Sequence, residues 1–368
     1  MDAFYLNNAK LYQDLVASFD PTRPAAHFSR HTAKPTRAIP DAPAPTLDHV
    51  DENMSTIARI RPMLEDELAT GFPCAIFPRQ DESQILDLHD LYHHPLKRPY
   101  LKSYKYQVDK AFGSDSSTEQ IYTDVVAPLV QFAQQGGIGT LFAYGQTGSG
   151  KTYTISQIQE LVASTLLDQQ NSQEIQITIF DLAGNIAHDL LNAQKRFSIL
   201  EDEAGNTVLA GASEHTVASR DEMLALLAEA VVYRRTAPTL KNDASSRSHS
   251  ICRIRIPRSC GTLYLIDLAG SEAARDIAEH GAERMRETKE INVSLSVLKD
   301  CIRGKAEGKT FIPVRGSMLT KVLKHVFEPR GERVCKTAVI ACVNPCLADV
   351  GASRNTLRYA ETLRVRRQ

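Results

Sequence analysis

Hydrophobic residues along this chain follow two patterns, short β-branched runs and longer stretches with helical spacing. The short runs predict strands at residues 55–60, 141–144, 175–180, 251–256 and 263–266. The longer stretches predict helices at residues 117–133, 157–167 and 220–236, the first with a kink at Pro128. Strands that alternate with helices favour an α/β fold, in which helices cover both faces of a sheet.

Six prolines between residues 21 and 45 separate the N-terminus from the rest of the chain. Together with the surrounding Ala, Thr and Arg they sustain neither a helix nor an internal strand, so residues 21–50 are predicted to be an extended linker. The folded domain is then residues 51–368. Apolar positions within residues 1–20 have loosely helical spacing, which predicts a short helix in this N-terminal extension. A flexible helix is favoured there over a partner site.

A polar segment separates a strand expected at 85–88 from another at 106–108. It contains His93, His94, Lys97, Arg98, Lys102 and Lys105. The histidines have no helical i, i+4 partner and no nearby cysteine, so a solvated loop is favoured over a metal site.

Composition narrows the class of protein. The 368 residues are 42% hydrophobic and 24% charged, values typical of a globular domain large enough for its own core. The seven cysteines show no C-x-x-C spacing, which favours reduced thiols over a disulfide framework or a zinc site. No apolar run reaches the length of a membrane span and the N-terminus does not resemble a signal peptide, so we expect a cytoplasmic protein.

Residues Gly145–Thr152 carry the pattern G-x-x-x-x-G-K-T of a phosphate loop. An apolar strand precedes the loop and a helix-compatible stretch follows it, which is the context that this motif requires. Backbone N–H groups of the loop would surround phosphates, Lys151 would reach the β- and γ-phosphates, and the Thr152 hydroxyl would bind Mg²⁺. A nucleoside triphosphate is the implied ligand.

Two later segments have the chemistry of nucleotide sensors. Asn242–His249 gathers hydroxyls, an amide and a guanidinium, groups that hold an attacking water and complete Mg²⁺ coordination. Asp267–Glu272 follows a buried-type strand and begins D-x-x-G, in which the Asp holds the Mg²⁺ shell and Gly270 offers its N–H to the γ-phosphate. The same letters at Asp181–Gly184 are interpreted as a decoy, because Asn-Ile follows them rather than Ser-Glu.

These motifs resemble those of the kinesin motor domain, in the family order and over about residues 54–367. The resemblance rests on Arg59–Pro62, Phe142–Thr152, Asn242–His249, Asp267–Glu272, Glu290–Leu295 and Asn355–Ala360. It implies an α/β, kinesin-like P-loop NTPase fold, with a central mixed, mainly parallel sheet and helices on both faces. ATP and Mg²⁺ are the implied cofactors, and microtubules are the implied partner.

The resemblance also implies a role for each matching residue. Those that would bind the nucleotide are Arg59, Arg61, Pro62, Gln146, Thr147, Gly148, Ser149, Gly150, Lys151, Thr152 and Tyr153. Those that would act in catalysis are Asn242, Ser245, Ser246, Arg247, Gly270 and Glu272. The Mg²⁺ ligands would be Thr152, Ser246 and Asp267. Arg247 and Glu272 would form the salt bridge that closes both switch loops around ATP.

Positive charge is concentrated toward the C-terminal end of the chain. Residues 299–336 hold ten cations and four carboxylates, an excess of six, whereas the whole chain has a formal charge of −1. An acidic partner fits this asymmetry. No aromatic platform is interleaved with these charges, which gives little support to single-stranded nucleic acid. The resemblance to kinesins, in which this region faces the microtubule, implies tubulin as the partner. The expected microtubule-facing residues are Lys299, Arg303, Lys305, Lys309, Arg315, Lys321 and Lys324.

Within the family, Leu298–Arg303 resembles the helix signature of internal motors, which remove tubulin from microtubule ends. The loop before Tyr106 is shorter than in that subfamily and lacks its Lys-Val-Asp tip, and Met318 stands where kinesins usually have a lysine. Depolymerisation is the preferred activity, with a translocating motor or a low-turnover microtubule tether as alternatives. The expected location is the microtubule cytoskeleton or spindle. Neither membrane nor nucleic acid is expected as a partner. Any dimerisation is expected to occur through segments absent from this chain.

Overall fold

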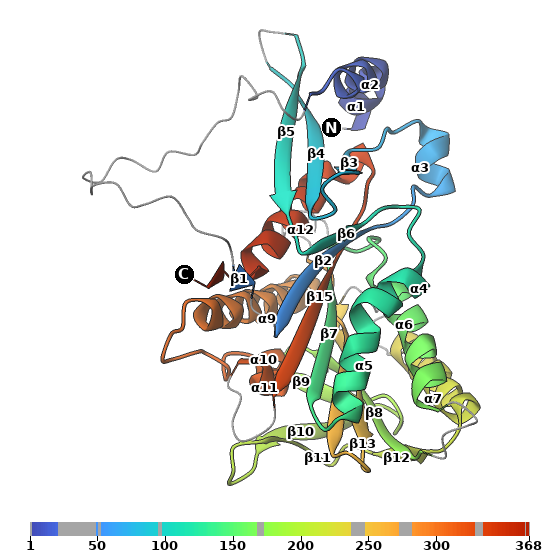
Figure 1. Ribbon diagram of the computed structural model, residues 1–368, viewed down its shortest axis with the longest axis vertical. Helices are drawn as coiled ribbons and strands as arrows, with labels where there is room; N and C mark the ends of the chain where they lie inside the picture. Colours follow the sequence, from blue (N-terminus) through green and yellow to red (C-terminus); the bar gives the residue numbers. More distant parts are fainter. Residues whose placement is uncertain are drawn as a thin grey trace.

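The computed structural model describes residues 2–20, 49–50, 53–94, 98–167, 173–236, 247–271, 282–327, 334–364 and 366–367. In this part of the chain an 11-stranded sheet forms the centre of the molecule (Figure 1). Its strands, in spatial order, are β11 (Thr207–Ala210), β10 (Lys195–Glu201), β9 (Ile186–Asp189), β8 (Ile175–Ala183), β13 (His249–Ile256), β14 (Gly261–Asp267), β7 (Ile138–Tyr144), β15 (Cys335–Val343), β2 (Met54–Ile60) and β6 (Lys110–Phe112), with β12 (His215–Val217) beside β8.

The sheet is mixed, as predicted. The parallel arrangement belongs to the part around the phosphate loop, where β14, β7, β15, β2 and β6 all run in one direction. From β14 outward through β13, β8, β9, β10 and β11 the pairing is antiparallel. Asp267 at the end of β14 is in register with Ala143 near the end of β7. The two strands therefore bring their carboxyl ends to one edge, where ligands of open α/β sheets bind.

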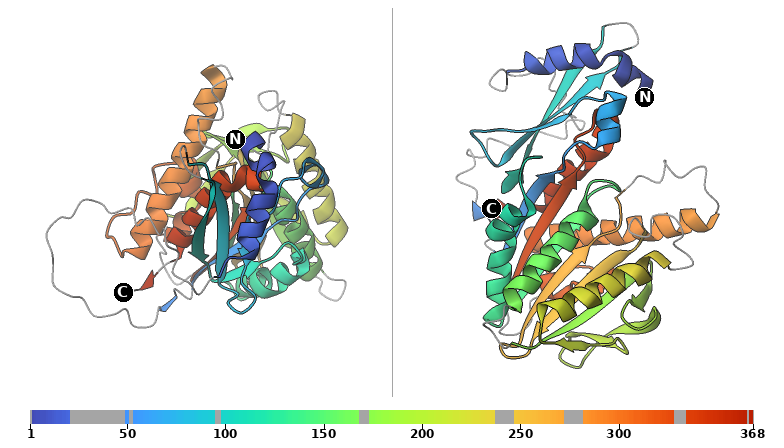
Figure 2. Two further views of the ribbon diagram at one scale, coloured as in Figure 1. Left: turned by 90° about the horizontal axis from the view of Figure 1, so that it is seen from above. Right: turned by 90° about the vertical axis from the view of Figure 1, so that its right-hand side faces the viewer.

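Helices cover both faces of this sheet, which confirms the predicted fold class (Figure 2). One face carries α4 (Thr118–Ile121), α5 (Ala127–Gln134), α6 (Lys151–Leu166) and α7 (Arg220–Thr236), and the other carries α9 (Ala282–Ala306), α10 (Met318–Val322), α11 (Lys324–Phe327) and α12 (Val350–Leu363). Leu141 and Ala143 of β7 pack in the first core, and Phe142 and Tyr144 pack in the second. Because both faces of β7 are buried, its sequence is continuously apolar.

The helix expected at 117–133 is interrupted near its middle. After α4 the backbone forms a π-helical turn, η1 (Tyr122–Val126), and α5 then begins with Pro128 in its first turn. Proline lacks an N–H group and its ring clashes within a helix interior, but it fits the first turn of a helix. Pro128 was predicted to kink or split this helix, and the structure shows the split.

Three shorter strands form a second sheet, in the order β3 (Ile76–Pro78), β4 (Ile85–Tyr92) and β5 (Tyr100–Gln107). The strand β5 begins earlier than expected, so Lys102 and Lys105 lie on a strand and not in the polar loop, and Lys97 lies outside the described residues. Two short strands, β1 (His49–Val50) and β16 (Arg366–Arg367), pair with each other in antiparallel orientation. The remaining elements are α3 (Glu65–Thr70) and a 3-10 turn, η4 (Leu347–Asp349).

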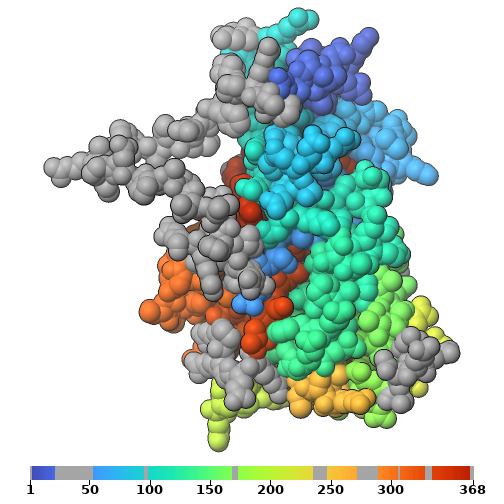
Figure 3. Space-filling view, viewed as in Figure 1, coloured from blue at the N-terminus to red at the C-terminus, as the bar shows by residue number. Residues whose placement is uncertain are grey.

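The N-terminal extension packs against this small sheet, so the expectation of a flexible helix is wrong. It forms α1 (Asp2–Asn7) and α2 (Ala9–Ala17), which lie beside β4 and β5 (Figure 1). In the space-filling view the dark-blue atoms of this extension lie against the rest of the molecule (Figure 3). Tyr5 is 4% exposed and its hydroxyl donates to Asp90 Oδ1 at 2.9 Å, and Tyr12 is 1% exposed with its hydroxyl 3.0 Å from the Cys74 carbonyl oxygen. Two buried tyrosines with satisfied hydroxyls anchor the helix pair, because each combines apolar burial with a hydrogen bond.

The cysteines and the helices bear on two further expectations. All seven cysteines are free thiols, which agrees with the absence of a disulfide framework. Among the helices that the structure describes, none combines the length and the apolar character that crossing a bilayer requires.

Candidate nucleotide-binding site

The phosphate loop turns sharply between β7 and α6. The φ angles of Gly145, Gly148 and Gly150 are 155°, 75° and 91°, and a Cβ on Gly145 would lie 2.3 Å from the Cys342 carbonyl oxygen. Only glycine fits such a close approach to a neighbouring backbone. Because α6 begins at Lys151, the N–H groups of its first turn and the positive end of its dipole lie at the loop. This is a site where an anion is stabilised.

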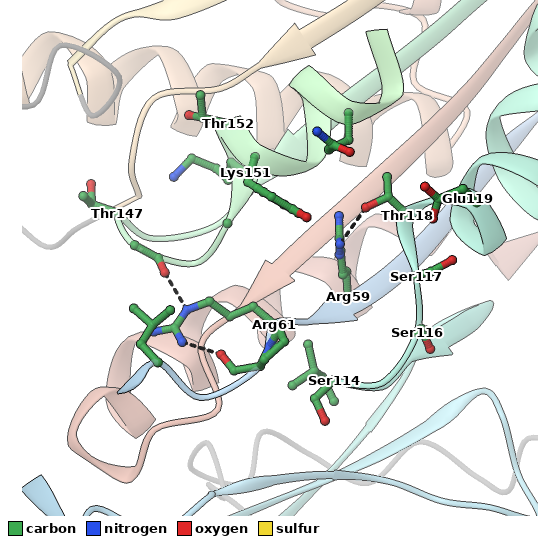
Figure 4. Close-up of a pocket in the computed structure, with 17 residues that line it drawn as sticks. Arg59, Arg61, Ser114, Ser116, Ser117, Thr118, Glu119, Thr147, Lys151 and Thr152 are labelled. Carbon is green, nitrogen blue, oxygen red and sulfur yellow. Dashed lines mark hydrogen bonds between the residues drawn. The ribbon is translucent and has the colours of Figure 1, made fainter. Parts of the chain in front are cut away.

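A pocket of about 710 Å³ opens beside this loop (Figure 4). It is lined from the segments 59–62, 114–119 and 147–153, which come from β2, the start of α4 and the phosphate loop. The predicted nucleotide-binding residues that line it are Arg59, Arg61, Pro62, Thr147, Gly148, Gly150, Lys151, Thr152 and Tyr153. Gln146 and Ser149 are buried within the loop instead, at 5% and 1% exposure. The structure therefore brings together residues that lie far apart in the sequence.

Arg59 crosses one wall of the pocket. Its guanidinium donates to Thr154 Oγ1 and to Thr118 Oγ1, both at 2.8 Å, and lies 5.5 Å from the centre of the Tyr153 ring. Burial lowers the pKa of Arg59, although an arginine remains charged. The residue thus joins β2 to α4 and α6 while Tyr153, which is 62% exposed, offers an open aromatic face.

At the edge of the sheet where β7 and β14 end, the phosphate loop contacts β14. Thr152 Oγ1 donates to Asp267 Oδ2 at 2.8 Å, and Lys151 Nζ donates to the Gln146 carbonyl at 2.8 Å. The second oxygen, Asp267 Oδ1, is buried and makes no hydrogen bond to any described residue. A buried carboxylate oxygen without a partner is costly unless a ligand satisfies it.

Arg234 of α7 holds the same carboxylate from the other side. Its Nη1 donates to Asp267 Oδ2 at 2.8 Å, its Nη2 donates to the Ser248 carbonyl at 2.9 Å, and its Nε lies 3.4 Å from Asp181 Oδ1. Ser248 in turn donates to Asp181 Oδ2 at 2.9 Å. Burial alone lowers the pKa of Arg234, but the two carboxylates outweigh it and raise the pKa. Asp181, from the segment interpreted as a decoy, is thus a buried partner of Arg234.

His249 ends the first sensor segment and links it to Ala269 of the second sensor segment and to Ser294 of α9. The N–H of Ala269 donates to His249 Nδ1 at 3.0 Å, and His249 Nε2 lies 2.8 Å from Ser294 Oγ, which donates to the Ile291 carbonyl. These contacts fix the tautomer with the proton on Nε2. Burial, with the nearby Arg234 and Lys151, lowers the pKa of His249 to about 3, so the ring is neutral at physiological pH.

The donor set fits Mg²⁺ bound together with a nucleotide. A threonine hydroxyl and a carboxylate with one oxygen unpartnered meet at the mouth of an anion-binding loop. Mg²⁺ commonly takes only one or two protein ligands and completes its octahedron with phosphate and water. Among the described residues there is no cluster of three or more His, Cys, Asp or Glu that could hold a metal ion by itself.

Comparison with known families decides between phosphate-loop proteins that share these features. The kinesin motor domain profile matches residues 59–365 of this chain, which include the pocket and both sensor segments. The chain belongs to the kinesin motor domain family. A spindle kinesin and other kinesins also match it individually.

Three of these relatives show how far the similarity extends. Diatom spindle kinesin-1 of Cylindrotheca fusiformis is 39% identical over 73% of this chain and 44% of its own length. Kinesin-like protein KIN-13B of Arabidopsis thaliana is 32% identical over 72% of this chain and 41% of its own length. Kinesin-like protein KIF24 of Mus musculus is 34% identical over 72% and 20%. The chain thus spans less than half the length of each.

Only part of the predicted switch machinery of this kinesin domain lies in the described residues. Asn242, Ser245, Ser246 and Glu272 lie outside them, and so does the predicted Arg247–Glu272 latch. Arg247 itself is half-buried. Gly270 is buried beside the phosphate loop, and the N–H of the following Ser271 donates to the Gly145 carbonyl at 3.2 Å. The roles assigned to these switch residues stay predictions.

The predicted microtubule-facing cations lie on and around α9, α10 and α11, but they are not equally available. Arg303 and Lys309 are exposed, and Lys299 and Lys321 are half-buried. Lys305 Nζ donates to the Val326 carbonyl at 2.8 Å, and Arg315 pairs with Glu201 at 2.9 Å.

Lys324 must be removed from this set. It is 4% exposed, and its ammonium donates to Glu201 Oε2 at 2.7 Å and to the Gly205 carbonyl at 3.0 Å. The charge count along the sequence could not show this, because Glu201 lies on β10, 123 residues away.

Three residues that support the pocket were not predicted from the sequence. Arg234 is the charged residue between Asp181 and Asp267, and Glu67 and Asn344 lie behind Arg61. For Arg234 the sequence predicted only the helix that contains it, from the spacing of apolar residues, and not its role beside the pocket. Glu67 had a local signal, since an acidic residue in the first turn of α3 stabilises the start of a helix.

Proposed function

We propose that this kinesin domain is a microtubule-stimulated ATPase that hydrolyses ATP with Mg²⁺ and couples the reaction to microtubule binding. The observation that carries the proposal is the contact between Thr152 of the phosphate loop and Asp267 of β14, whose other carboxylate oxygen makes no hydrogen bond within the described part of the chain. It joins the phosphate-binding element to the sensor segment at one point.

In the proposed reaction, water adds to the γ-phosphorus as the bond to the β–γ bridging oxygen breaks, which yields ADP and inorganic phosphate. Bound Mg²⁺ would supply positive charge at the phosphates, held by Thr152, Asp267 and Ser246. Lys151 would neutralise charge at the β- and γ-phosphates, while Arg59 and Tyr153 would line the base and sugar region of the pocket.

The remaining roles in the reaction rest on the resemblance alone. Asn242 and Ser245 would place the water, and the Gly270 N–H would face the γ-phosphate. The Arg247–Glu272 salt bridge would hold both switches closed while that phosphate is present. Such loops order around the γ-phosphate and relax after hydrolysis, which is how nucleotide state reaches the partner surface.

The proposed partner surface is the exposed cationic face of α9 and the segment that follows it. Arg303 and Lys309 are exposed there, together with half-buried Lys299 and Lys321. Acidic tubulin would be attracted to this face, and the attraction would weaken as salt screens it. Membership of the kinesin family supports tubulin over another acidic polymer, and it supports a location on the microtubule cytoskeleton or spindle.

A steady-state ATPase assay with and without microtubules tests the proposal. We expect turnover to rise when microtubules are added, and their affinity to fall as salt is raised. A rate of ATP hydrolysis that does not change when microtubules are added would support a generic phosphate-loop ATPase instead. Microtubule binding with negligible turnover would leave a nucleotide-dependent tether.

We further propose that the domain depolymerises microtubule ends. The Lys299-Asp300-Cys301 helix signature supports this, as does similarity to KIN-13B and KIF24. The hairpin of β4 and β5 carries Lys102 and Lys105, and α1 packs against it near its turn through Tyr5 and Asp90. Depolymerisation requires tighter binding to curved than to straight tubulin, since equal binding shifts no equilibrium.

Imaging of stabilised microtubules over time decides this finer proposal. We expect the filaments to shorten from their ends when the domain and ATP are present. Constant lengths, under conditions in which binding and turnover are both measured, would contradict depolymerisation. Directional movement of surface-tethered domain would then support a translocating motor.

A further inference from the structure

Arg61 forms the part of the pocket wall that lies against the phosphate loop. Its Nε donates to the Gly148 carbonyl at 2.7 Å, and its Nη1 donates to the Pro62 carbonyl at 2.7 Å (Figure 4). Gly148 has a φ of 75° and no atom near its Cβ position, so the loop is not held there by side-chain packing of its own. The Arg61 contact is therefore a direct restraint on the shape of the loop.

Glu67 of α3 holds this guanidinium from behind. Arg61 Nη1 donates to Glu67 Oε2 at 2.8 Å, and Arg61 Nη2 donates to Glu67 Oε1. A planar guanidinium and a carboxylate joined by two bonds form a strong and geometrically specific pair. The side chains are only 10% and 17% exposed, so solvent screens the pair weakly. Arg61 also holds the pKa of Glu67 below its ordinary value.

Glu67 is itself fixed to the central sheet. Asn344, which is 3% exposed and directly follows β15, donates from Nδ2 to Glu67 Oε1 at 3.4 Å and to Asp349 Oδ2 at 2.6 Å. Its Oδ1 accepts the N–H of Cys346 at 2.9 Å. Because β15 pairs directly with β7, the strand that leads into the phosphate loop, Glu67 and the loop are anchored on neighbouring strands.

We infer that Glu67 is a positioning residue that holds Arg61 against the phosphate loop and thereby slows the release of bound nucleotide. The inference rests on the proposed function, since it requires a nucleotide in this pocket. Glu67 does not line the pocket and acts only through Arg61. Its loss would free the guanidinium to leave the Gly148 carbonyl and would relax the loop.

A purely structural role for Glu67 can be separated from this one. Glu67 also accepts the Leu64 N–H at 2.8 Å and so caps the start of α3. A glutamine at this position of a capping box supports the helix start as glutamate does. The substitution Glu67→Gln therefore keeps the cap and removes the charge that pairs with Arg61. Glu65→Gln, on the exposed side of the same helix, is the matched control.

The measurement is the release rate of methylanthraniloyl-ADP, preloaded with Mg²⁺ and chased with excess unlabelled ATP. We expect Glu67→Gln to release the probe about ten times faster than the wild type, the order of magnitude that a charged hydrogen-bonded pair contributes. Glu65→Gln should match the wild type. The melting temperature without nucleotide should be similar in both variants.

A double-mutant cycle supplies the second readout. Arg61→Lys keeps the positive charge but loses the two-bond geometry, so it should also speed release. Combining it with Glu67→Gln should add little, because both changes break one linkage. Additive effects would overturn the inference, and so would a Glu67→Gln release rate equal to that of Glu65→Gln. Failure of the wild type to bind the probe would instead overturn the proposed function, and this inference with it.

Discussion

The nucleotide pocket and the cationic surface were both predicted from charged and polar residues, yet the structure uses those residues differently. Around the pocket each charged group meets a specific partner: Arg59 two threonines, Arg61 a glutamate, and Arg234 two aspartates. On the surface, three of the ten counted cations, Lys305, Arg315 and Lys324, bind groups within the protein, so the excess of six overstates the charge that a partner can reach. A charged residue that belongs to a motif therefore predicts a specific contact, whereas a count of charges along the sequence does not show which of them are available to a partner.

The physical reason is burial. A buried charge is tolerated only when paired and hydrogen-bonded, so the residues around a pocket must be placed specifically. An exposed cation gains little from any one partner and is free to face solvent or another protein. Removing a pocket charge should thus act on binding or stability strongly, and removing a surface charge should act weakly and only on the partner.

Lys151→Ala should have the largest effect. The phosphates would lose the point charge that lies across their backbone cradle, so affinity for ATP should fall by orders of magnitude. Fluorescence titration with labelled ATP measures the affinity. The control is Lys10→Ala, at an exposed position of α2. Undiminished ATP affinity would show that the phosphate loop has been assigned to the wrong ligand.

Arg234→Met should act on stability. It leaves Asp181 and Asp267 buried without their shared cation, and breaking a buried pair in this way costs about 3–5 kcal/mol. Urea denaturation measures the free energy of unfolding. Arg220→Met, at the exposed start of the same helix, should change it by no more than about 0.5 kcal/mol. An equal loss of unfolding free energy in both variants would contradict a stabilising role for the buried network of Arg234, Asp181 and Asp267.

Two cations on the predicted surface separate partner binding from folding. Exposed Arg303→Gln should weaken microtubule affinity roughly two- to fivefold and leave basal ATPase and stability unchanged. Buried Lys324→Gln should instead lower the free energy of unfolding by about 1–3 kcal/mol, because the Gly205 carbonyl loses its donor and Glu201 keeps only Arg315. Co-sedimentation and denaturation of both variants measure this. The reverse assignment of effects would contradict the placement of Lys324 inside the protein.

The sequence predicted the parts of the fold that depend on local pattern. The runs that became β7, β8, β13 and β14 were visible from their apolar residues, and the phosphate loop from glycines that its backbone angles require. The pocket residue Lys151 was predicted from the spacing of the phosphate-loop motif, whereas Arg59 was predicted only through the resemblance to kinesins.

What the sequence could not show depends on contacts between distant segments. Arg234 reaches Asp267 across 33 positions, and Lys324 reaches Glu201 across 123. Residues 2–20 were expected to be flexible because a short helix is marginal in isolation. The burial of Tyr5 and Tyr12 against β4 and its neighbours supplies the missing stability. The sequence of the two helices does not show that this small sheet is their partner.

The central claim is that the nucleotide in the pocket and the microtubule at the cationic surface influence each other. The most direct test is the equilibrium affinity of this domain for microtubules, measured by co-sedimentation with a non-hydrolysable ATP analogue and again with ADP. Linkage requires that if microtubules change nucleotide affinity, nucleotide changes microtubule affinity by the same factor. We expect the two affinities to differ by about 5- to 150-fold, the usual range of coupling between sites. Equal affinities in both nucleotide states would contradict the account.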